Sequence, residues 1–151
     1  MLRLSGLFAA ALCLLGLNAC IKDDQRDLDR NAILSYLTNN NLSATEHESG
    51  IFYILDTPGS GGHPGADAKV TVKYKAFYLD DTLLDETEAD STATFNLAGL
   101  IEGWRIAIPL LQKGGKGTFW IPSGLAYGSN PPFGVQPNAV LRFNIELIDF
   151  Q

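Results

Sequence analysis

The chain contains few cysteines and histidines, which limits the disulfides and metal sites that it can form. Its two cysteines, Cys13 and Cys20, both lie within the first twenty positions. They are therefore too far from the rest of the chain to form a disulfide within its folded part. The two histidines, His47 and His63, lie in polar or glycine-rich stretches, where we expect solvated loop side chains. Because no Cys/His cluster has metal-ligand spacing, we expect no metal site.

The sequence also lacks the motifs of two other kinds of site. No histidine lies near a serine–aspartate pair, and no glycine-rich loop suits a phosphate. We therefore expect no nucleophilic hydrolase and no cofactor.

Basic residues are few as well. The 151 residues include 11 lysines and arginines against 17 aspartates and glutamates, a net charge of −6. A basic surface for a phosphate backbone is thus absent, and we expect no nucleic acid partner. The length suits one domain, and the hydrophobic fraction of 46% is typical of a folded chain.

The chain has one long apolar run, at residues 7–17, and it is too short to span a bilayer well. Arg3 precedes it, so residues 1–19 are predicted to be a secretory signal peptide. The end of the run, Leu17-Asn18-Ala19-Cys20, resembles the lipobox of bacterial lipoproteins. This resemblance implies a lipid on Cys20, whose two or three acyl chains would anchor the protein firmly. An ordinary secretory signal followed by an incidental cysteine is the alternative.

A charged tether is predicted at residues 21–25. The Lys22-Asp23-Asp24 within it resembles the export signal that places some Bacteroidetes lipoproteins on the cell surface, and a solvated spacer is an equal alternative. The predicted location is the bacterial cell envelope, lipid-anchored at the outer membrane and facing the periplasm or the cell surface. We expect Cys20, the tether and a helix in residues 20–50, and a folded domain in residues 51–151.

The helix is predicted at residues 27–39. Leu28, Ile33, Tyr36 and Leu37 fall at roughly helical spacing, with acidic residues in the first turn. The sequence leaves three roles open: the helix packs on the domain, extends it from the lipid, or pairs two copies.

Most of the remaining chain has the pattern of strands. Residues 69–79 alternate, with Val70, Val72, Tyr74, Ala76 and Tyr78 on one face, as in a half-buried antiparallel strand. Further strands are predicted at residues 50–55, 83–84, 94–97, 116–121 and 139–150, with a short helix at 105–111. Pro109 requires that helix to be short or kinked. We expect an α+β domain in which a strongly bent antiparallel sheet wraps around one short helix.

Two features point to a binding site. In residues 100–104, Gly103 lets the backbone pass close to something large, and the Trp104 indole must point into the core or a cavity floor. The long loop at residues 122–138 contains four prolines and three glycines, yet also Leu125, Tyr127 and Phe133. It is too apolar for disorder, and such loops in compact domains are usually functional.

From about residue 67 to the C-terminus, the order and spacing of seven motifs resemble the FKBP-type peptidyl-prolyl isomerases. The motifs are Val70-x-Val72-x-Tyr74, Leu84-Asp85, Phe95-Asn96-Leu97, Leu100-Ile101-Glu102-Gly103-Trp104, Ile121-Pro122, Leu125-Ala126-Tyr127-Gly128 and Pro137-Asn138-Ala139-Val140-Leu141-Arg142-Phe143. The helix before the domain resembles the leaders of secreted bacterial FKBP lipoproteins. The family fold, a half-open antiparallel sheet curled around a short helix, agrees with the pattern described above.

The resemblance implies a role for each pocket residue. Trp104 corresponds to the indole floor under the proline ring, and Leu100 and Ile101 lie at the rim, where Ile101 offers a backbone N–H. Tyr127 corresponds to the hydroxyl that reaches a substrate carbonyl, and Asp85 to the carboxylate beside the twisting amide. The apolar walls are Tyr74, Phe95, Val135 and Phe143.

The sequence departs from the family pattern at five positions. Leu84 replaces the usual Phe, which leaves the pocket apolar but less tightly walled, and Ala93 occupies a second position that is often aromatic. Ala76 and Asp81 replace expected glycines. Gln136 replaces the first proline of the usual Ile-Pro-Pro, which predicts a less rigid loop.

The activity that this resemblance implies requires no nucleophile, metal or cofactor. Rotation about an X–Pro bond breaks amide resonance, so it takes tens to hundreds of seconds at 25 °C. An apolar pocket with a few hydrogen-bond donors needs only to bind the twisted amide preferentially. The expected partners are proline-containing unfolded or exported polypeptides, the membrane through the lipid on Cys20, and macrolide-type inhibitors.

Two other readings remain open. The departures at Leu84, Ala93 and Gln136 favour a catalytically weak proline-binding or chaperone-like module anchored to the membrane. A passive spacer on a lipid anchor is a third reading, against which the concentration of pocket motifs argues.

Overall fold

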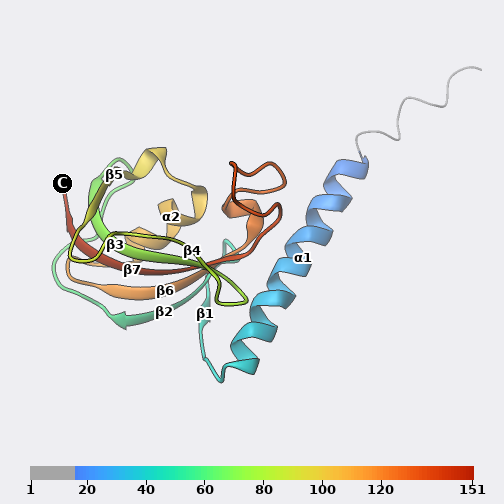
Figure 1. Ribbon diagram of the computed structural model, residues 1–151, viewed down its shortest axis with the longest axis horizontal. Helices are drawn as coiled ribbons and strands as arrows, with labels where there is room; N and C mark the ends of the chain where they lie inside the picture. Colours follow the sequence, from blue (N-terminus) through green and yellow to red (C-terminus); the bar gives the residue numbers. More distant parts are fainter. Residues whose placement is uncertain (1–15) are drawn as a thin grey trace, which may run out of the picture.

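The computed structural model describes residues 16–151, and their side chains from Asp24 onward. Within that part of the chain, two α-helices and seven β-strands alternate with short 3₁₀ turns (Figure 1). The α-helices are α1 (Gly16–Asn39) and α2 (Glu102–Ala107). The strands are β1 (Thr45–Glu46), β2 (Phe52–Thr57), β3 (Lys69–Tyr78), β4 (Leu83–Glu86), β5 (Ala93–Asn96), β6 (Lys116–Ile121) and β7 (Leu141–Phe150).

All seven strands form one antiparallel sheet in the order β1-β2-β6-β7-β3-β4. The long strand β3 lies against β7 on one edge, and its other edge carries two short strands. There β5 pairs with residues 69–72 and β4 with residues 75–77. Register irregularities interrupt the pairing of β3 with both β4 and β7, and such bulges increase local bending and twist. The predicted α+β fold, a bent antiparallel sheet around one short helix, is confirmed.

The main core lies between the concave face of the sheet and α2. Val70, Val72 and Ala76 of β3 are buried there, on the face that the alternation predicts. Gly103 allows the close approach of α2, because a Cβ at this position would overlap the side chain of Ile121 on β6. The predicted role of Gly103 is therefore confirmed.

Helix α2 is short, as Pro109 requires. It ends at Ala107, and residues 108–110 continue as a 3₁₀ turn (Ile108–Leu110) that contains the proline. Proline lacks an N–H and its ring clashes with the preceding turn of an α-helix, so the α-helical pattern stops before it.

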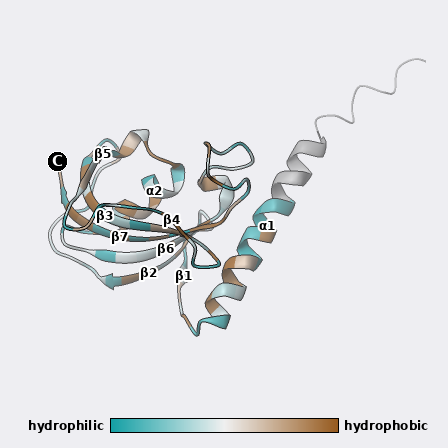
Figure 2. Cartoon of the chain, viewed as in Figure 1, coloured by the Kyte–Doolittle hydropathy of each residue, from teal (hydrophilic) through white to brown (hydrophobic). Residues whose placement is uncertain are grey.

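The convex face of the sheet carries a second apolar cluster, covered by α1. Ile33 and Leu37 of α1 pack with Phe52, Trp120 and Val140. Successive side chains of β6 point to opposite faces, so Trp120 faces α1 whereas Phe119 faces α2. Figure 2 shows the corresponding apolar residues in the second half of α1, interleaved with hydrophilic ones. Of the three roles left open for this helix, packing on the domain is the one observed.

Helix α1 ends at Asn39 as predicted, but it begins at Gly16 rather than Asp27. Residues 17–26 contain neither proline nor glycine, and a nucleated helix extends through such residues. The predicted tether at 21–25 is therefore helical. Within residues 16–151, no helix is long and apolar enough to cross a bilayer.

The lipoprotein predictions fall largely outside the described residues. Most of the predicted signal peptide, residues 1–15, is not described. Cys20 lies within α1, and its side chain too is outside the described part.

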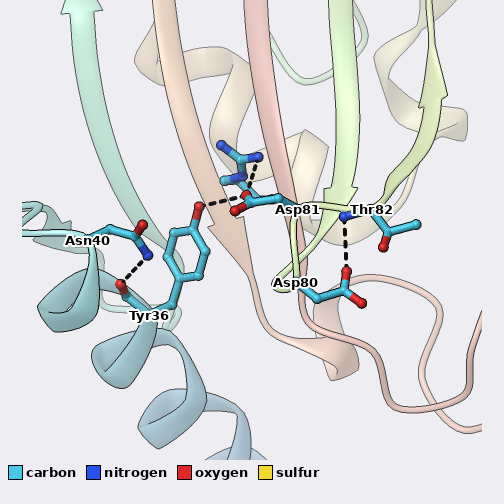
Figure 3. Close-up of polar contacts among 6 residues, drawn as sticks. Tyr36, Asn40, Asp80, Asp81 and Thr82 are labelled. Atoms are coloured by element: carbon cyan, nitrogen blue, oxygen red, sulfur yellow. Dashed lines mark hydrogen bonds and ion pairs between the residues drawn. The ribbon is translucent and has the colours of Figure 1, made fainter.

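A polar cluster joins α1 to the turn between β3 and β4. The Tyr36 hydroxyl donates a hydrogen bond of 2.9 Å to Asp81, whose side chain also accepts one of 2.8 Å from Arg142 (Figure 3). Asp81 has φ +65°, a left-handed conformation that suits the glycine expected here from the family resemblance. Its carboxylate supplies two contacts that glycine could not make.

Arg142, on β7, is largely shielded from solvent. Its guanidinium lies over the Phe77 ring at 4.4 Å from the centroid, and its side chain is only 17% exposed. The covering helix removes it from solvent. Lys75, by contrast, is exposed and pairs with Glu86 at 2.8 Å.

The two histidines are more constrained than solvated loop residues. The exposed ring of His63 has its Nδ1 2.8 Å from the carbonyl oxygen of Pro109, which links the loop before β3 to the end of α2. His47 bonds through Nδ1 to Ser49 in the turn between β1 and β2. Strand β1, which pairs with β2, was not predicted.

Candidate active site

The structure brings all ten predicted pocket residues together around one cavity of about 400 Å³ on the concave side of the sheet. The ten are Tyr74, Leu84, Asp85, Phe95, Leu100, Ile101, Trp104, Tyr127, Val135 and Phe143. Three further residues also line it: Ala76, Phe133 and Gly134. Of these, Phe133 is fully exposed at the rim. Its position in an unusually apolar loop could have predicted it as a pocket residue.

The floor of the cavity is the indole of Trp104, in the first turn of α2. Three rings meet it nearly at right angles: Tyr74 at 5.1 Å between centroids, Phe143 at 5.5 Å and Phe95 at 6.0 Å. Edge-to-face contacts of this kind are favourable for aromatic rings. The rings come from three different strands, so the curvature of the sheet assembles them around α2. Trp104 is 5% exposed and borders the cavity.

A bulge in β4 directs two consecutive residues into the same wall. Asp85 pairs with Ala76 and Leu83 with Phe77, which leaves Leu84 as the extra residue. In a regular strand, consecutive side chains point to opposite faces, but here both Leu84 and Asp85 line the cavity. Leu83 is 46% exposed.

The polar groups of the site are two phenols and one carboxylate. The Tyr74 hydroxyl donates a 2.5 Å hydrogen bond to Asp85, and burial together with this bond strongly raises the pKa of Tyr74. Burial, and to a lesser degree the charge of Asp85, raise the pKa of Tyr127. Both phenols are therefore protonated at neutral pH and remain hydrogen-bond donors.

Tyr127 differs from Tyr74 in having an unengaged hydroxyl. In the part of the chain that the structure describes, no group accepts a hydrogen bond from it, and the residue is 39% exposed. The phenol is thus a donor available to a molecule in the cavity.

The turn that carries Tyr127 is closed by backbone hydrogen bonds. It follows a 3₁₀ turn (Ser123–Leu125), and the carbonyl of Ser123 accepts from the N–H groups of Ala126 at 3.0 Å and Gly128 at 2.8 Å. Gly128 has φ +61°, a conformation that a glycine adopts without strain. Tyr127 is therefore held between two residues bonded to the same carbonyl.

The other end of the loop is held by Gln136. Its backbone N–H donates a 3.1 Å hydrogen bond to the Tyr78 hydroxyl. The proline expected at this position from the family resemblance has no N–H to donate. The substitution expected to loosen the loop thus brings a constraint of its own, beside Val135 of the cavity wall.

Leu100 and Ile101 form the rim where the chain enters α2. A 3₁₀ turn (Leu97–Gly99) precedes them, capped by the Asn96 side chain, which accepts from Ala98 N–H at 3.1 Å. The Ile101 carbonyl caps α2 by accepting from Trp104 N–H at 3.0 Å. Among the described residues, no group accepts from the N–H of Ile101.

The cavity thus combines apolar walls, one aromatic floor and a few polar groups at its edge. Among the described residues, the donors of the cavity without an acceptor are the Tyr127 hydroxyl and the Ile101 N–H, and Asp85 is the one charged residue that lines it. No three His, Cys, Asp or Glu side chains lie close enough to hold a metal ion, in the part of the chain that the structure describes. Such a cavity suits a compact apolar ring flanked by carbonyl groups.

Comparison with known sequences places the chain in a family. Residues 61–148 match the family described as FKBP-type peptidyl-prolyl cis-trans isomerase. A probable FKBP-type peptidyl-prolyl cis-trans isomerase FkpA of Neisseria meningitidis is 39% identical over 104 residues, covering 66% of this chain and 38% of that protein. The outer membrane protein MIP of Legionella longbeachae is 38% identical over 102 residues, covering 66% and 44%. The chain therefore spans less than half the length of these relatives.

Solved structures agree. FkpA from Escherichia coli superposes with a TM-score of 0.75 at 28% identity, covering 89% of this chain and 64% of that one. A peptidyl-prolyl cis-trans isomerase from Pseudomonas syringae superposes with a TM-score of 0.71, also at 28% identity, covering 83% and 95%. With motifs, fold and sequence in agreement, the chain belongs to the FKBP-type peptidyl-prolyl cis-trans isomerase family.

Proposed function

We propose that the protein accelerates the cis/trans isomerisation of X–Pro bonds in polypeptides. The observation that carries the proposal is the cavity itself, in which residues of four strands and of the loop at residues 122–138 surround the Trp104 indole with aromatic and aliphatic walls. A pyrrolidine ring is small, apolar and compact. Family membership supports the same activity.

The pocket would act by favouring the twisted amide over the planar one. A planar amide is dipolar and well solvated in water, whereas rotation by 90° removes resonance and weakens that solvation. An apolar cavity withdraws the solvation that stabilises the planar form, so the barrier of about 18–20 kcal/mol falls. Each tenfold gain in rate requires about 1.4 kcal/mol of selective stabilisation.

The free donors at the rim would hold the carbonyls of the twisting segment. The Tyr127 hydroxyl and the Ile101 N–H have no acceptor within the described part of the chain, so neither must give up a hydrogen bond seen there to bind substrate. Asp85, with one oxygen occupied by Tyr74, would lie beside the amide. Leu84 and Tyr127 would flank the side of the residue before proline, so we expect a preference for an apolar residue there.

The direct test is NMR exchange spectroscopy on a short Xaa-Pro peptide. We expect the cis and trans signals to exchange faster with the protein present. Trp104→Ala should abolish most of the effect, and Tyr127→Phe should lower it about tenfold through loss of one hydrogen bond in the transition state.

Two other outcomes would replace the proposal. Peptide binding without rate enhancement would identify a catalytically weak proline-binding or chaperone-like module, which the departures at Leu84, Ala93 and Gln136 favour. Neither binding nor rate enhancement would leave only a spacer. A macrolide-type FKBP inhibitor should compete with the peptide in either of the first two cases.

The proposed location is the bacterial cell envelope, with a lipid on Cys20 and unfolded or exported polypeptides as substrates. The signal-like residues 1–19, which end directly before Cys20, support this location. So does the relative named as an outer membrane protein. Radiolabelled fatty acid should be incorporated into the wild-type chain in bacterial cells and not into Cys20→Ala. Equal labelling of both would rule out this anchor.

A further inference from the structure

A buried carboxylate lies on α1, outside the region that matches the isomerase family. Asp29 is 3% exposed and Ser123 is 1% exposed, and they are the two buried polar residues among those described. The family match begins at residue 61, so Asp29 precedes the domain in sequence whereas Ser123 belongs to it. A carboxylate is rarely buried unless its oxygens are well bonded, because burial removes its hydration.

The Asp29 oxygens accept three hydrogen bonds. Oδ2 accepts from the Ser123 backbone N–H at 2.8 Å and from the Ser123 Oγ–H at 2.6 Å. Oδ1 accepts from the Gln25 side chain at 2.8 Å, one turn earlier in α1. Because both the backbone and the side chain of Ser123 are bound, the carboxylate fixes the position of that residue in the chain.

Ser123 in turn organises the turn of Tyr127. Its carbonyl accepts from the N–H groups of Ala126 and Gly128, which flank the tyrosine on either side. A shift of Ser123 therefore moves both neighbours of Tyr127 together. The route from Asp29 to the cavity consists of only three contacts: carboxylate to Ser123, Ser123 carbonyl to the turn, and the turn to the phenol.

We propose that Asp29 is a positioning residue for the isomerase site, and that α1 sets the place of the Tyr127 hydroxyl by clamping Ser123. This proposal rests on the proposed function for its kinetic consequence, but its structural part does not. It gives the helix before the domain a role in activity. Deleting or undocking α1 would then change the reaction as well as the stability.

A second anchor of the same helix provides the matched control. Tyr36 lies about two turns further along α1 and donates one hydrogen bond of 2.9 Å to Asp81 in the turn between β3 and β4 (Figure 3). Neither Tyr36 nor Asp81 lines the cavity, and neither is hydrogen-bonded to the turn of Tyr127. Tyr36→Phe therefore weakens the docking of α1 and leaves the hydrogen bonds between Asp29 and Ser123, the clamp, unchanged.

The experiment compares Asp29→Ala, Asp29→Asn and Tyr36→Phe in the full chain, below the unfolding temperature of each. Asp29→Ala leaves the two Ser123 donors without an acceptor, so we expect kcat/KM on the Xaa-Pro peptide to fall about tenfold. Asp29→Asn keeps one oxygen that accepts from both donors and should remain within about twofold of wild type. Tyr36→Phe should leave kcat/KM unchanged.

A double variant separates positioning from general destabilisation. If Asp29 acts through Tyr127, then Tyr127→Phe should produce little further loss in the Asp29→Ala background. If the two losses instead multiply, or if Tyr36→Phe lowers kcat/KM as much as Asp29→Ala, the proposal is wrong.

NMR of the resting protein distinguishes failure of this proposal from failure of the proposed function. In Asp29→Ala, and not in Tyr36→Phe, the Gly128 amide and the Tyr127 ring signals should shift or broaden. A wild-type protein without isomerase activity would overturn the proposed function. The Gly128 and Tyr127 signals would then still test whether Asp29 positions the turn of Tyr127. Unchanged Gly128 and Tyr127 signals in Asp29→Ala would overturn the clamp, whatever the activity.

Discussion

The two tryptophans lie on opposite faces of the same sheet, and they differ in what covers them. Trp104, at the start of α2, forms the floor of a cavity on the concave face. Trp120, on β6, lies on the convex face beneath α1, where the Tyr36 ring meets it at 6.1 Å between centroids. Their exposed fractions, 5% and 1%, hardly distinguish them.

The difference lies in the packing above each indole. Above Trp120, Ile33 and Leu37 of α1 complete a closed apolar cluster, and the indole N–H is buried without an acceptor among the described residues. Above Trp104, three rings stand at its edges and leave space for a ligand. Burial alone therefore does not separate a structural tryptophan from one in a binding site.

The largest expected effect is on stability, at the closed face. Trp120→Ala should lower the free energy of unfolding by about 3–5 kcal/mol, because the cavity it leaves under α1 is sealed on all sides. Urea denaturation followed by far-ultraviolet circular dichroism would measure it. A loss below about 1 kcal/mol would mean that α1 does not cover this indole in solution.

The second effect is on activity, and it contrasts the two faces directly. Trp104→Phe should lower kcat/KM about tenfold, since a smaller ring leaves the proline ring poorly supported. Trp120→Phe, the same change on the other face, should leave kcat/KM as in wild type. Equal kinetic effects of the two variants would show that Trp104 and Trp120 do not differ in their contribution to activity.

The smallest expected effect is on the pH dependence of the unfolding free energy. Here one tyrosine–aspartate pair on each face of the sheet is compared. Burial and then the Asp85 hydrogen bond raise the pKa of Tyr74, and burial and then the Asp81 hydrogen bond raise that of Tyr36, where the Arg142 charge opposes the shift. Folding thus favours the protonated phenols. Their contribution to stability is complete below the unfolded pKa of about 10 and is lost as the pH rises above it.

We therefore expect the unfolding free energy to fall as the pH rises above about 10, and to depend little on the titration of either tyrosine between pH 6 and pH 9. Tyr74→Phe should flatten the alkaline decline more than Tyr36→Phe does. Urea denaturation at each pH, with phenolate absorbance as a second signal, would measure both. An identical alkaline decline in wild type and Tyr74→Phe would show that the Tyr74 pair does not persist in solution.

Much of the fold followed from local pattern. The alternation in residues 69–78 predicted β3 and its buried face, and Gly103 and Pro109 predicted the close approach and the short length of α2. These features depend on side-chain period and backbone sterics, which a single sequence displays. The bulge at Leu84 was not predictable in this way, because its register is set by pairing with β3.

The residues of the pocket were partly predictable from the sequence. Its ten residues were named from motifs that resemble a family, and the cavity contains them all, with Phe133, Gly134 and Ala76 in addition. The burial of Arg142 could not be predicted from the sequence, because nothing near it in the sequence indicates that a helix more than a hundred positions earlier covers it.

The sequence by itself determined the bent sheet, through the period of its side chains, and its motifs resembled a family closely enough to name ten of the residues that surround the cavity. Only the tertiary structure decided that α1 lies on the convex face, that Trp120 is sealed while Trp104 borders a cavity, and that Asp29 holds Ser123. The contact between Asp29 and Ser123 joins residues 94 positions apart. Such contacts depend on which buried polar and apolar groups find partners, and local pattern carries no information about that choice.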